Sequence, residues 1–140
     1  MILLDTNVLS EILRIEPSPA VVDWYSRQIP KALFISSLTL AEMLAGISVL
    51  PTGKRKTALS KSFAKNIRPQ FEGRILPFDE NAAERYADIQ TAMRRAGRAI
   101  SAIDCQIAAI ASAHSFAVAT RDVRPFEDAG IDVINPWIEV

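Results

Sequence analysis

The stretch Met1-Ile2-Leu3-Leu4-Asp5-Thr6-Asn7 opens the chain and decides the fold that we expect. Its apolar run is typical of a short strand that is buried on both faces. The run stops at Asp5, and residues 8–13 then have helical spacing. A strand that ends in Asp and turns into a helix places this carboxylate at the carboxyl edge of a sheet, where open α/β folds bind ligands. Helix capping by Asp5 or Thr6 explains the same residues, so both interpretations stay open for this stretch alone.

Length and composition favour one globular domain, residues 1–140, with enough apolar residues (49%) for a real core. The formal net charge is zero, but the charges are unevenly placed. Between Lys54 and Arg98 there are eleven Lys and Arg against five Asp and Glu, so the rest holds five basic and eleven acidic residues. This asymmetry predicts a basic surface beside an acidic pocket. A solvated helix face is the ordinary alternative.

The single cysteine, Cys105, excludes an internal disulfide and fits a reducing compartment. The apolar start is interrupted by Asp5, which argues against a secretion signal, and no segment approaches transmembrane length. We therefore expect a soluble cytoplasmic protein that has no membrane partner.

Strand-like and helix-like segments alternate along the chain. Further strands are predicted at 32–36, 73–78, 116–120 and 133–134, and helices at 20–25, 37–49, 54–67, 80–96 and 105–114. Alternation of this kind predicts an α/β fold, here a three-layer sandwich whose short, mostly parallel central sheet is flanked by helices. Right-handed crossovers then bring the carboxyl ends of the strands to one edge of the sheet.

Four acidic residues fall at this edge. Asp5 and Asp122 end strands, while Glu42 and Asp104 lie in the first turns of helices that begin there. We therefore expect the four carboxylates to converge. The segments 39–42 and 101–104 also match capping boxes, so Glu42 and Asp104 each have a purely structural explanation.

Crowded carboxylates repel one another and are tolerated when a cation lies between them. Oxygen ligands select Mg²⁺ or Mn²⁺, and phosphoester hydrolysis by metal-activated water is the commonest chemistry at such a site. His114 is the only histidine, which excludes RNA cleavage by a histidine pair. Cys105 lies in an apolar helix and suits a core position better than a nucleophile. A phosphate-binding glycine loop is missing from the sequence, which argues against nucleotide hydrolysis.

Four segments carry a resemblance to a known family. They resemble the four motifs of PIN-domain ribonucleases, and the chain is similar in particular to VapC toxins of the FitB-like subgroup. The segments are 3–11 (LLDTNVLSE), 35–42 (ISSLTLAE), 104–109 (DCQIAA) and 119–122 (ATRD). Residues 73–80 and the ending Asn135-Pro136-Trp137 resemble that subgroup too, so the resemblance covers Met1 to about Trp137.

The resemblance implies a PIN-like fold and a Mg²⁺-dependent endoribonuclease (Mn²⁺ is the other candidate ion) that acts as the toxin of a type II toxin–antitoxin pair. The catalytic and metal-binding residues it implies are Asp5, Glu42, Asp104 and Asp122, with Thr120, Thr6 and Asn7 in support. Basic residues that we expect to follow the RNA backbone are Lys54, Arg55, Lys56, Arg94, Arg95 and Arg98.

The resemblance also implies partners. They are a second copy of the chain in a homodimer and a small VapB-like antitoxin, which forms a larger hetero-oligomer with the toxin. The antitoxin's tail blocks the pocket and its amino-terminal part binds operator DNA. Ile12, Leu13, Trp24 and Leu44 exceed what one sheet face needs, which favours a partner groove or a dimer contact, with ordinary core as the alternative.

Two other functions compete with the nuclease. The first alternative is a regulatory module that acts on DNA through its partner and in which the nuclease site is secondary. The second is an aspartyl-phosphate phosphatase or a phosphoacceptor domain. The phosphatase signature needs a second Asp two residues after the first, where this chain has Asn7.

Overall fold

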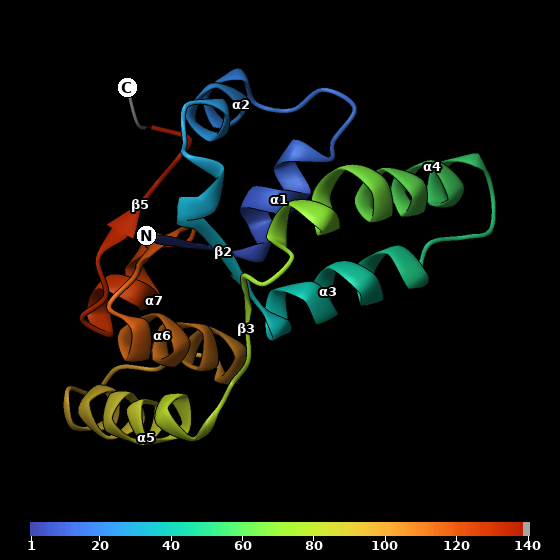
Figure 1. Cartoon of the computed structure of the whole chain (residues 1–140). Coiled ribbons are helices and arrows are strands. Elements are labelled where there is room, and N and C mark those ends of the chain that lie inside the picture. Colours follow the sequence, from blue (N-terminus) through green and yellow to red (C-terminus); the bar gives the residue numbers. More distant parts are fainter. Residues whose placement is uncertain (139–140) are drawn as a thin grey trace.

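A computed structural model describes residues 1–138 (Figure 1). The strands are β1 (Ile2–Leu4), β2 (Leu33–Ser36), β3 (Ile75–Leu76), β4 (Ala117–Ala119) and β5 (Val133–Ile134). The α-helices are α1 (Thr6–Ile12), α2 (Pro19–Ser26), α3 (Ser37–Ser48), α4 (Lys54–Ser62), α5 (Glu80–Arg95), α6 (Ala102–His114) and α7 (Val123–Asp128).

The strands form one parallel sheet in the order β3-β2-β1-β4-β5. The first strand lies in the middle, where Ile2 pairs with Leu33 of β2 on one side and with Ala117 of β4 on the other. The chain therefore leaves β1 toward one edge and later returns to build the opposite edge. Open α/β sheets bind ligands at the carboxyl end of such a reversal point, here between β1 and β4.

Neighbouring residues of the central strands face opposite layers, because side chains alternate along a strand. Leu3 and Val118 belong to a core cluster with α5, α6 and α7, whereas Leu4 and Ala119 belong to one with α1, α2, α3 and residues 63–71, which follow α4. Figure 1 shows the first group of helices at the lower left of the sheet and the second group at the upper right. The α/β three-layer sandwich expected from the sequence is confirmed.

The structure differs from the predicted elements in two places. A helix that the sequence analysis did not predict, α7, follows Asp122, and Phe126 anchors it in the core. The helix predicted over 54–67 leaves α-helical geometry after Ser62 and continues as a π-helical turn, Phe63–Ile67. Both end residues of this turn, Phe63 and Ile67, are buried in the core. Single π turns of this kind are rare insertions in α-helices.

Of the two explanations offered for the apolar residue Trp24, a partner contact or ordinary core, the structure supports the core. Its side chain is only 5% exposed and packs in the core cluster with Val21. Ile12 and Leu13 are half-buried against the same cluster, and Leu44 remains 42% exposed. The explanation as ordinary core therefore holds for most of this group.

None of the helices within residues 1–138 is both long and apolar enough to cross a membrane.

Candidate active site

Asp5 lies where β1 turns into α1. Its backbone N–H donates to the carbonyl of Ala119 (2.9 Å), which ties the end of β1 to the end of β4. One carboxylate oxygen, Oδ1, accepts from the N–H of Thr6 (2.8 Å), and the other, Oδ2, accepts from the hydroxyl of Thr120 (2.8 Å). Asp5 is therefore the cap of α1 and also a buried carboxylate, 7% exposed, at the edge predicted to bind a ligand.

Thr120 connects three predicted site residues through one hydroxyl. Besides donating to Asp5, its Oγ1 accepts from the side-chain amide of Asn7 (3.1 Å) and from the backbone N–H of Asp122 (3.0 Å). With donor and acceptor capacity both used, this hydroxyl has a single orientation. Thr120 and Asn7 thus fix the Asp5 carboxylate and the start of the Asp122 turn.

Glu42 is exposed on α3, and its Oε1 accepts from the hydroxyl of Thr6 (2.6 Å). The expected capping box from Thr39 to Glu42 is wrong, because the cap of α3 is Ser36, whose hydroxyl accepts from the N–H of Thr39 (3.1 Å). Glu42 therefore lies in the second turn of the helix and does not cap it. The hydroxyl of buried Thr39 lies 3.3 Å from that of Thr6, so it supports the same contact.

Asp104 and Asp122 reach the site from two further elements. Ser101 caps α6 by accepting from the N–H of Asp104 (3.1 Å), which confirms half of the predicted capping box and fixes the backbone of Asp104 in the first turn. Asp122 occupies the position before α7 but makes no capping hydrogen bond with its side chain. Its exposed carboxylate is therefore free to serve the site.

The carboxylates influence one another's ionisation. Burial raises the pKa of Asp5 above its ordinary 3.8, and the charges of Asp104 and Glu42 add to the rise, while hydrogen bonds from Thr120 and Thr6 oppose it. The pKa of Asp104 is raised in the same way by burial and by the charges of Asp122 and Glu42, against a hydrogen bond with Ser101. Carboxyl groups in a cleft whose pKa is shifted by burial and by specific neighbouring charges are candidates for a functional site.

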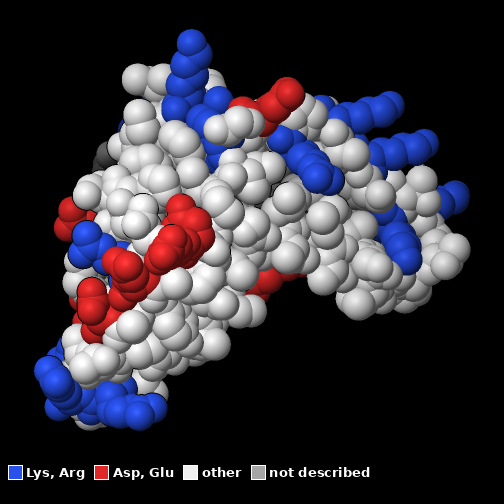
Figure 2. All heavy atoms as spheres, turned by 60° about the horizontal axis from the view of Figure 1, so that its bottom comes forward, with Lys and Arg blue, Asp and Glu red and all other residues white. Residues whose placement is uncertain are grey.

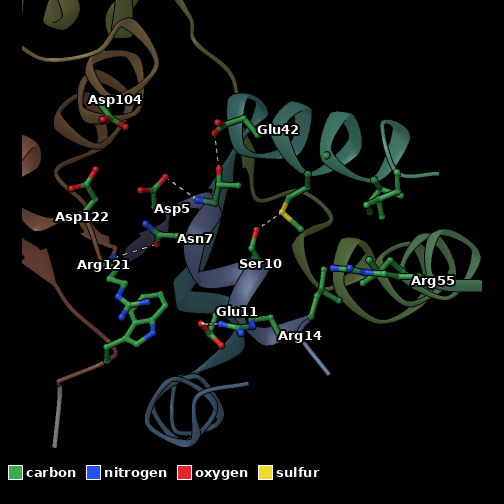
Figure 3. Close-up of a pocket in the computed structure, with 18 residues that line it drawn as sticks. Asp5, Asn7, Ser10, Glu11, Arg14, Glu42, Arg55, Asp104, Arg121 and Asp122 are labelled. Atoms are coloured by element: carbon green, nitrogen blue, oxygen red, sulfur yellow. Dashed lines mark hydrogen bonds and ion pairs between the residues drawn. The ribbon is translucent and has the colours of Figure 1, made fainter. Parts of the chain in front are cut away.

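All four acids line one open pocket of about 760 Å³. Figure 3 shows them around a shared space at one end, with Arg55 of α4 at the far end. Apolar side chains from α3, from α4 and from the segments that follow α1 and α3 also line the pocket: Leu13, Met43, Ile47, Leu50 and Leu59.

The donor chemistry of this pocket fits a hard divalent cation, because the acids offer only oxygen ligands. Within residues 1–138, however, three or more His, Cys, Asp or Glu side chains are nowhere close enough together to hold an ion as they stand. Carboxylates that repel one another keep apart in this way. Glu42 and Asp122 are exposed, so rotation of their side chains toward Asp5 is the movement that such a site requires.

The basic residues predicted to follow RNA lie in two separate places. Lys54, Arg55 and Lys56 begin α4, whereas Arg94 and Arg95 end α5 and Arg98 follows it. In Figure 2 blue side chains accordingly gather at the right, over α4, and at the lower left, at the end of α5, with a band of acidic side chains beside the latter. Of these six only Arg55 lines the pocket, so the single basic surface that we expected is not formed.

The charged and aromatic lining residues that were not predicted as site residues are Glu11, Arg14, Arg121 and Trp137. Glu11 is a buried carboxylate on α1 that accepts from the N–H of Ser18 (3.0 Å) and lies 3.4 Å from Arg14. Arg121 lies with its guanidinium carbon 5.2 Å from the ring centre of Trp137. The sequence signal for Arg121 was its place between Thr120 and Asp122, and for Glu11 its place in the first resembling segment.

Comparison with known proteins agrees with this geometry. The family model described as "PIN domain" matches residues 2–131, nearly the whole chain. The chain belongs to the PIN-domain family. Its relatives include "Plasmid stability protein StbB" of Pseudomonas syringae pv. tomato, 48% identical over 98% of this chain and 99% of that protein. "VapC ribonuclease Y4jK" of Sinorhizobium fredii is 45% identical over 98% of both chains.

Two solved structures of the family superpose closely. FitAcB from Neisseria gonorrhoeae has a TM-score of 0.95 at 45% identity and covers 99% of this chain and 100% of its own. FitAB bound to an IR36 DNA fragment has a TM-score of 0.94 at 47% identity, with 98% and 96% covered. The PIN fold and its family were therefore identified correctly from the four motifs.

Proposed function

We propose that this PIN-domain protein is a Mg²⁺-dependent endoribonuclease that acts as the toxin of a toxin–antitoxin pair. The observation that carries the proposal is the convergence of four carboxylates from four elements on one open pocket, with the most buried of them, Asp5, raised in pKa. The name of the VapC ribonuclease relative supports RNA as the substrate. Mn²⁺ is the alternative ion, because the same oxygen ligands suit it.

Each acid has a distinct place in this proposal. Asp5 and Asp104 are the first metal ligands, and Glu42 and Asp122 complete the cluster directly or through water. When bound, the ion neutralises phosphate charge and lowers the pKa of water. Thr120 holds the Asp5 carboxylate in one orientation, and Thr6 donates a hydrogen bond to Glu42.

Cleavage of cellular RNA by the purified chain, free of any partner, tests the nuclease. We expect fragments with Mg²⁺ or Mn²⁺ and none in chelator or with Asp5→Asn, across a range of salt. Intact RNA under every metal and salt condition would contradict the proposal. Sequencing of the cleaved ends after induction in cells identifies the RNA target.

We propose a small DNA-binding antitoxin as the partner, since the names FitAcB and FitAB describe two-component assemblies, one of them bound to DNA. These structures also favour a second function, regulation of DNA through the partner. An Asp5→Asn chain that still tightens the partner's binding to operator DNA separates this role from cleavage. If growth is unaffected when the wild-type chain is expressed without the partner, the regulatory role is favoured over the nuclease.

We further propose that the chain forms a homodimer. Exposed apolar side chains that are not used by the core, Leu44, Val49 and Ile103 among them, support a self-contact. Light scattering on the isolated chain and on the antitoxin complex measures this. A strictly monomeric toxin in both samples would contradict it.

A further inference from the structure

The pocket brings together a cation and an aromatic ring that lie far apart in the sequence. Arg121 follows β4, and Trp137 lies just beyond β5, near the end of the described chain. The guanidinium carbon of Arg121 lies 5.2 Å from the Trp137 ring centre, within the range of a cation–π contact, and both residues line the pocket. Arg121 is also held at its backbone, where the N–H donates to the side-chain oxygen of Asn7 (3.3 Å).

Arg121 differs from Arg14, another arginine in this pocket, in having no acidic partner among residues 1–138. Arg14 pairs with Glu11, whereas Arg121 makes no ion pair within residues 1–138. Its side chain is exposed even though Asp122 is its neighbour in the chain. Figure 3 shows Arg121 near Asp122 and Asn7, with its guanidinium directed away from the acid cluster and Arg55 on the opposite side of the pocket.

The Arg121 guanidinium bears on the electrostatics of the pocket. The pocket is lined by five acids and three arginines, so a phosphate chain is repelled by it before any cation binds. A guanidinium donates through a planar fork that matches phosphate oxygens, and stacking on an indole ring limits the rotation of this fork. Arg121 thus offers a preoriented phosphate contact beside the acids.

We propose that Arg121 binds a backbone phosphate of the RNA next to the cleaved bond, and that Trp137 acts through it as a positioning residue. The inference rests on the proposed nuclease function and deepens it by naming a substrate contact. Trp137 is not a stacking platform for a base in this proposal. Its ring sets the direction in which Arg121 presents its fork.

Arg121→Ala tests the contact. We expect KM for RNA to rise about tenfold with kcat little changed, since a contact made equally in ground state and transition state affects binding alone. The salt dependence of RNA affinity should also become shallower, by about 0.7 in the slope of log K against log salt, for one lost contact to a single strand. Arg121→Lys keeps the charge but loses the fork, so it should keep the slope and lose part of the affinity.

Arg124→Ala is the matched control, because Arg124 is an exposed arginine one turn further on, in α7, and is not among the residues that line the pocket. It should leave KM, kcat and the salt slope at wild-type values. Thermal melts establish that each variant is folded, which we expect because Arg121 is exposed.

A double-mutant cycle tests the role of Trp137. Trp137→Ala should weaken RNA binding in the wild-type background and add nothing to Arg121→Ala. Equal losses from Trp137→Ala in both backgrounds would show that the ring contacts RNA itself and would overturn the positioning role. Unchanged KM and salt slope in Arg121→Ala, or a loss confined to kcat, would overturn the phosphate contact.

Binding of a labelled single-stranded RNA pool of random sequence, measured in chelator, separates this inference from the nuclease proposal. If wild type cleaves RNA but Arg121→Ala binds and cleaves as well as wild type, only the inference fails. If wild type does not cleave, the nuclease proposal fails. The binding comparison between wild type and Arg121→Ala then still decides whether Arg121 is an RNA contact.

Discussion

Asp5 has two roles that are compatible at the level of single atoms. Oδ1 accepts the capping N–H of Thr6, while Oδ2 is held by the Thr120 hydroxyl. A carboxylate oxygen has two lone pairs, so each oxygen keeps acceptor capacity for a cation. Capping and metal binding were alternatives at the level of the sequence, and the structure allows both at once.

Substitution of Asp104 distinguishes capping from metal binding. Asn caps about as well as Asp, and Ser101 already supplies the cap of α6, so Asp104→Asn should leave the metal-free protein unchanged or slightly more stable. Mg²⁺ at ten times its dissociation constant should stabilise wild type by about 1.4 kcal/mol, and the variant should lose most of this gain. Thermal melts of both proteins, in chelator and in Mg²⁺, measure it. Equal Mg²⁺-induced shifts in the two proteins would show that Asp104 does not bind the metal.

The raised pKa of Asp5 predicts a pH dependence of stability. The folded chain keeps the Asp5 proton over a pH range in which the unfolded chain, with the ordinary pKa of 3.8, has lost it. The stability contributed by this group is therefore fully present below pH 3.8 and is lost as pH rises through the raised folded value. In chelator, wild type should lose stability relative to Asp5→Asn across this range. Denaturant titrations at several pH values measure the difference, and a pH-independent difference would contradict the prediction.

At the scale of secondary structure, helix starts position the acids. Asp5 caps α1, Asp104 lies in the first turn of α6 and Asp122 precedes α7, so three of the four acids lie near helix amino termini. The positive end of a helix dipole favours nearby negative charge. Short strands followed at once by helices therefore place the acids and also offset part of their repulsion.

A pair of cap substitutions tests whether a helix start serves the site or only the fold. Ser101 caps α6 at the acid cluster, and Asp79 caps α5, outside the pocket lining, by accepting from the N–H of Ala82 (2.9 Å). Ser101→Ala and Asp79→Ala should each cost about 1 kcal/mol of unfolding free energy. Only Ser101→Ala should also reduce RNA cleavage and the Mg²⁺ shift, because it frees the backbone of Asp104. Equal activity in the two variants would show that the cap does not position the acid.

At the scale of the whole molecule, the neutral net charge conceals two separate basic regions, one at α4 and one at the end of α5. Some of these charges are already engaged, since Arg98 pairs with Asp128 (3.0 Å) and Lys56 donates to the carbonyl of Ser48 (2.9 Å). Arg55 alone among the six lines the pocket. Position, more than the number of charges, should therefore decide which region contacts RNA.

Arg55 and Arg95 are both exposed helical arginines, so their substitutions form a matched pair that tests which region contacts RNA. Arg55→Ala should weaken RNA affinity several-fold and lower the salt slope by about 0.7, the value for one contact to a single strand. Arg95→Ala, at the end of α5, should change neither. Filter binding over a range of salt compares them. A larger loss from Arg95→Ala would move the RNA path to α5 and away from the pocket.

The layered α/β fold, the strand ends and the four acids could be predicted from the sequence, because each depends on local signals. Apolar runs of strand length, helical spacing and a carboxylate at each junction are readable within about ten residues. The family followed from the order of the motifs, and the fold and the family are both confirmed. The function of the acids stays a prediction that the geometry supports.

The residue pairs that meet across the pocket could not be predicted from the sequence. Ser36 in place of Thr39 as the cap of α3, the burial of Trp24 and the contact of Arg121 with Trp137 depend on packing between segments distant in the chain. The separation of the basic residues into two regions has the same origin, since α5 packs with α6 on one face of the sheet, whereas α4 contacts α3 on the other side. Local periodicity carries no information about such contacts, because they are set by how whole layers fit together.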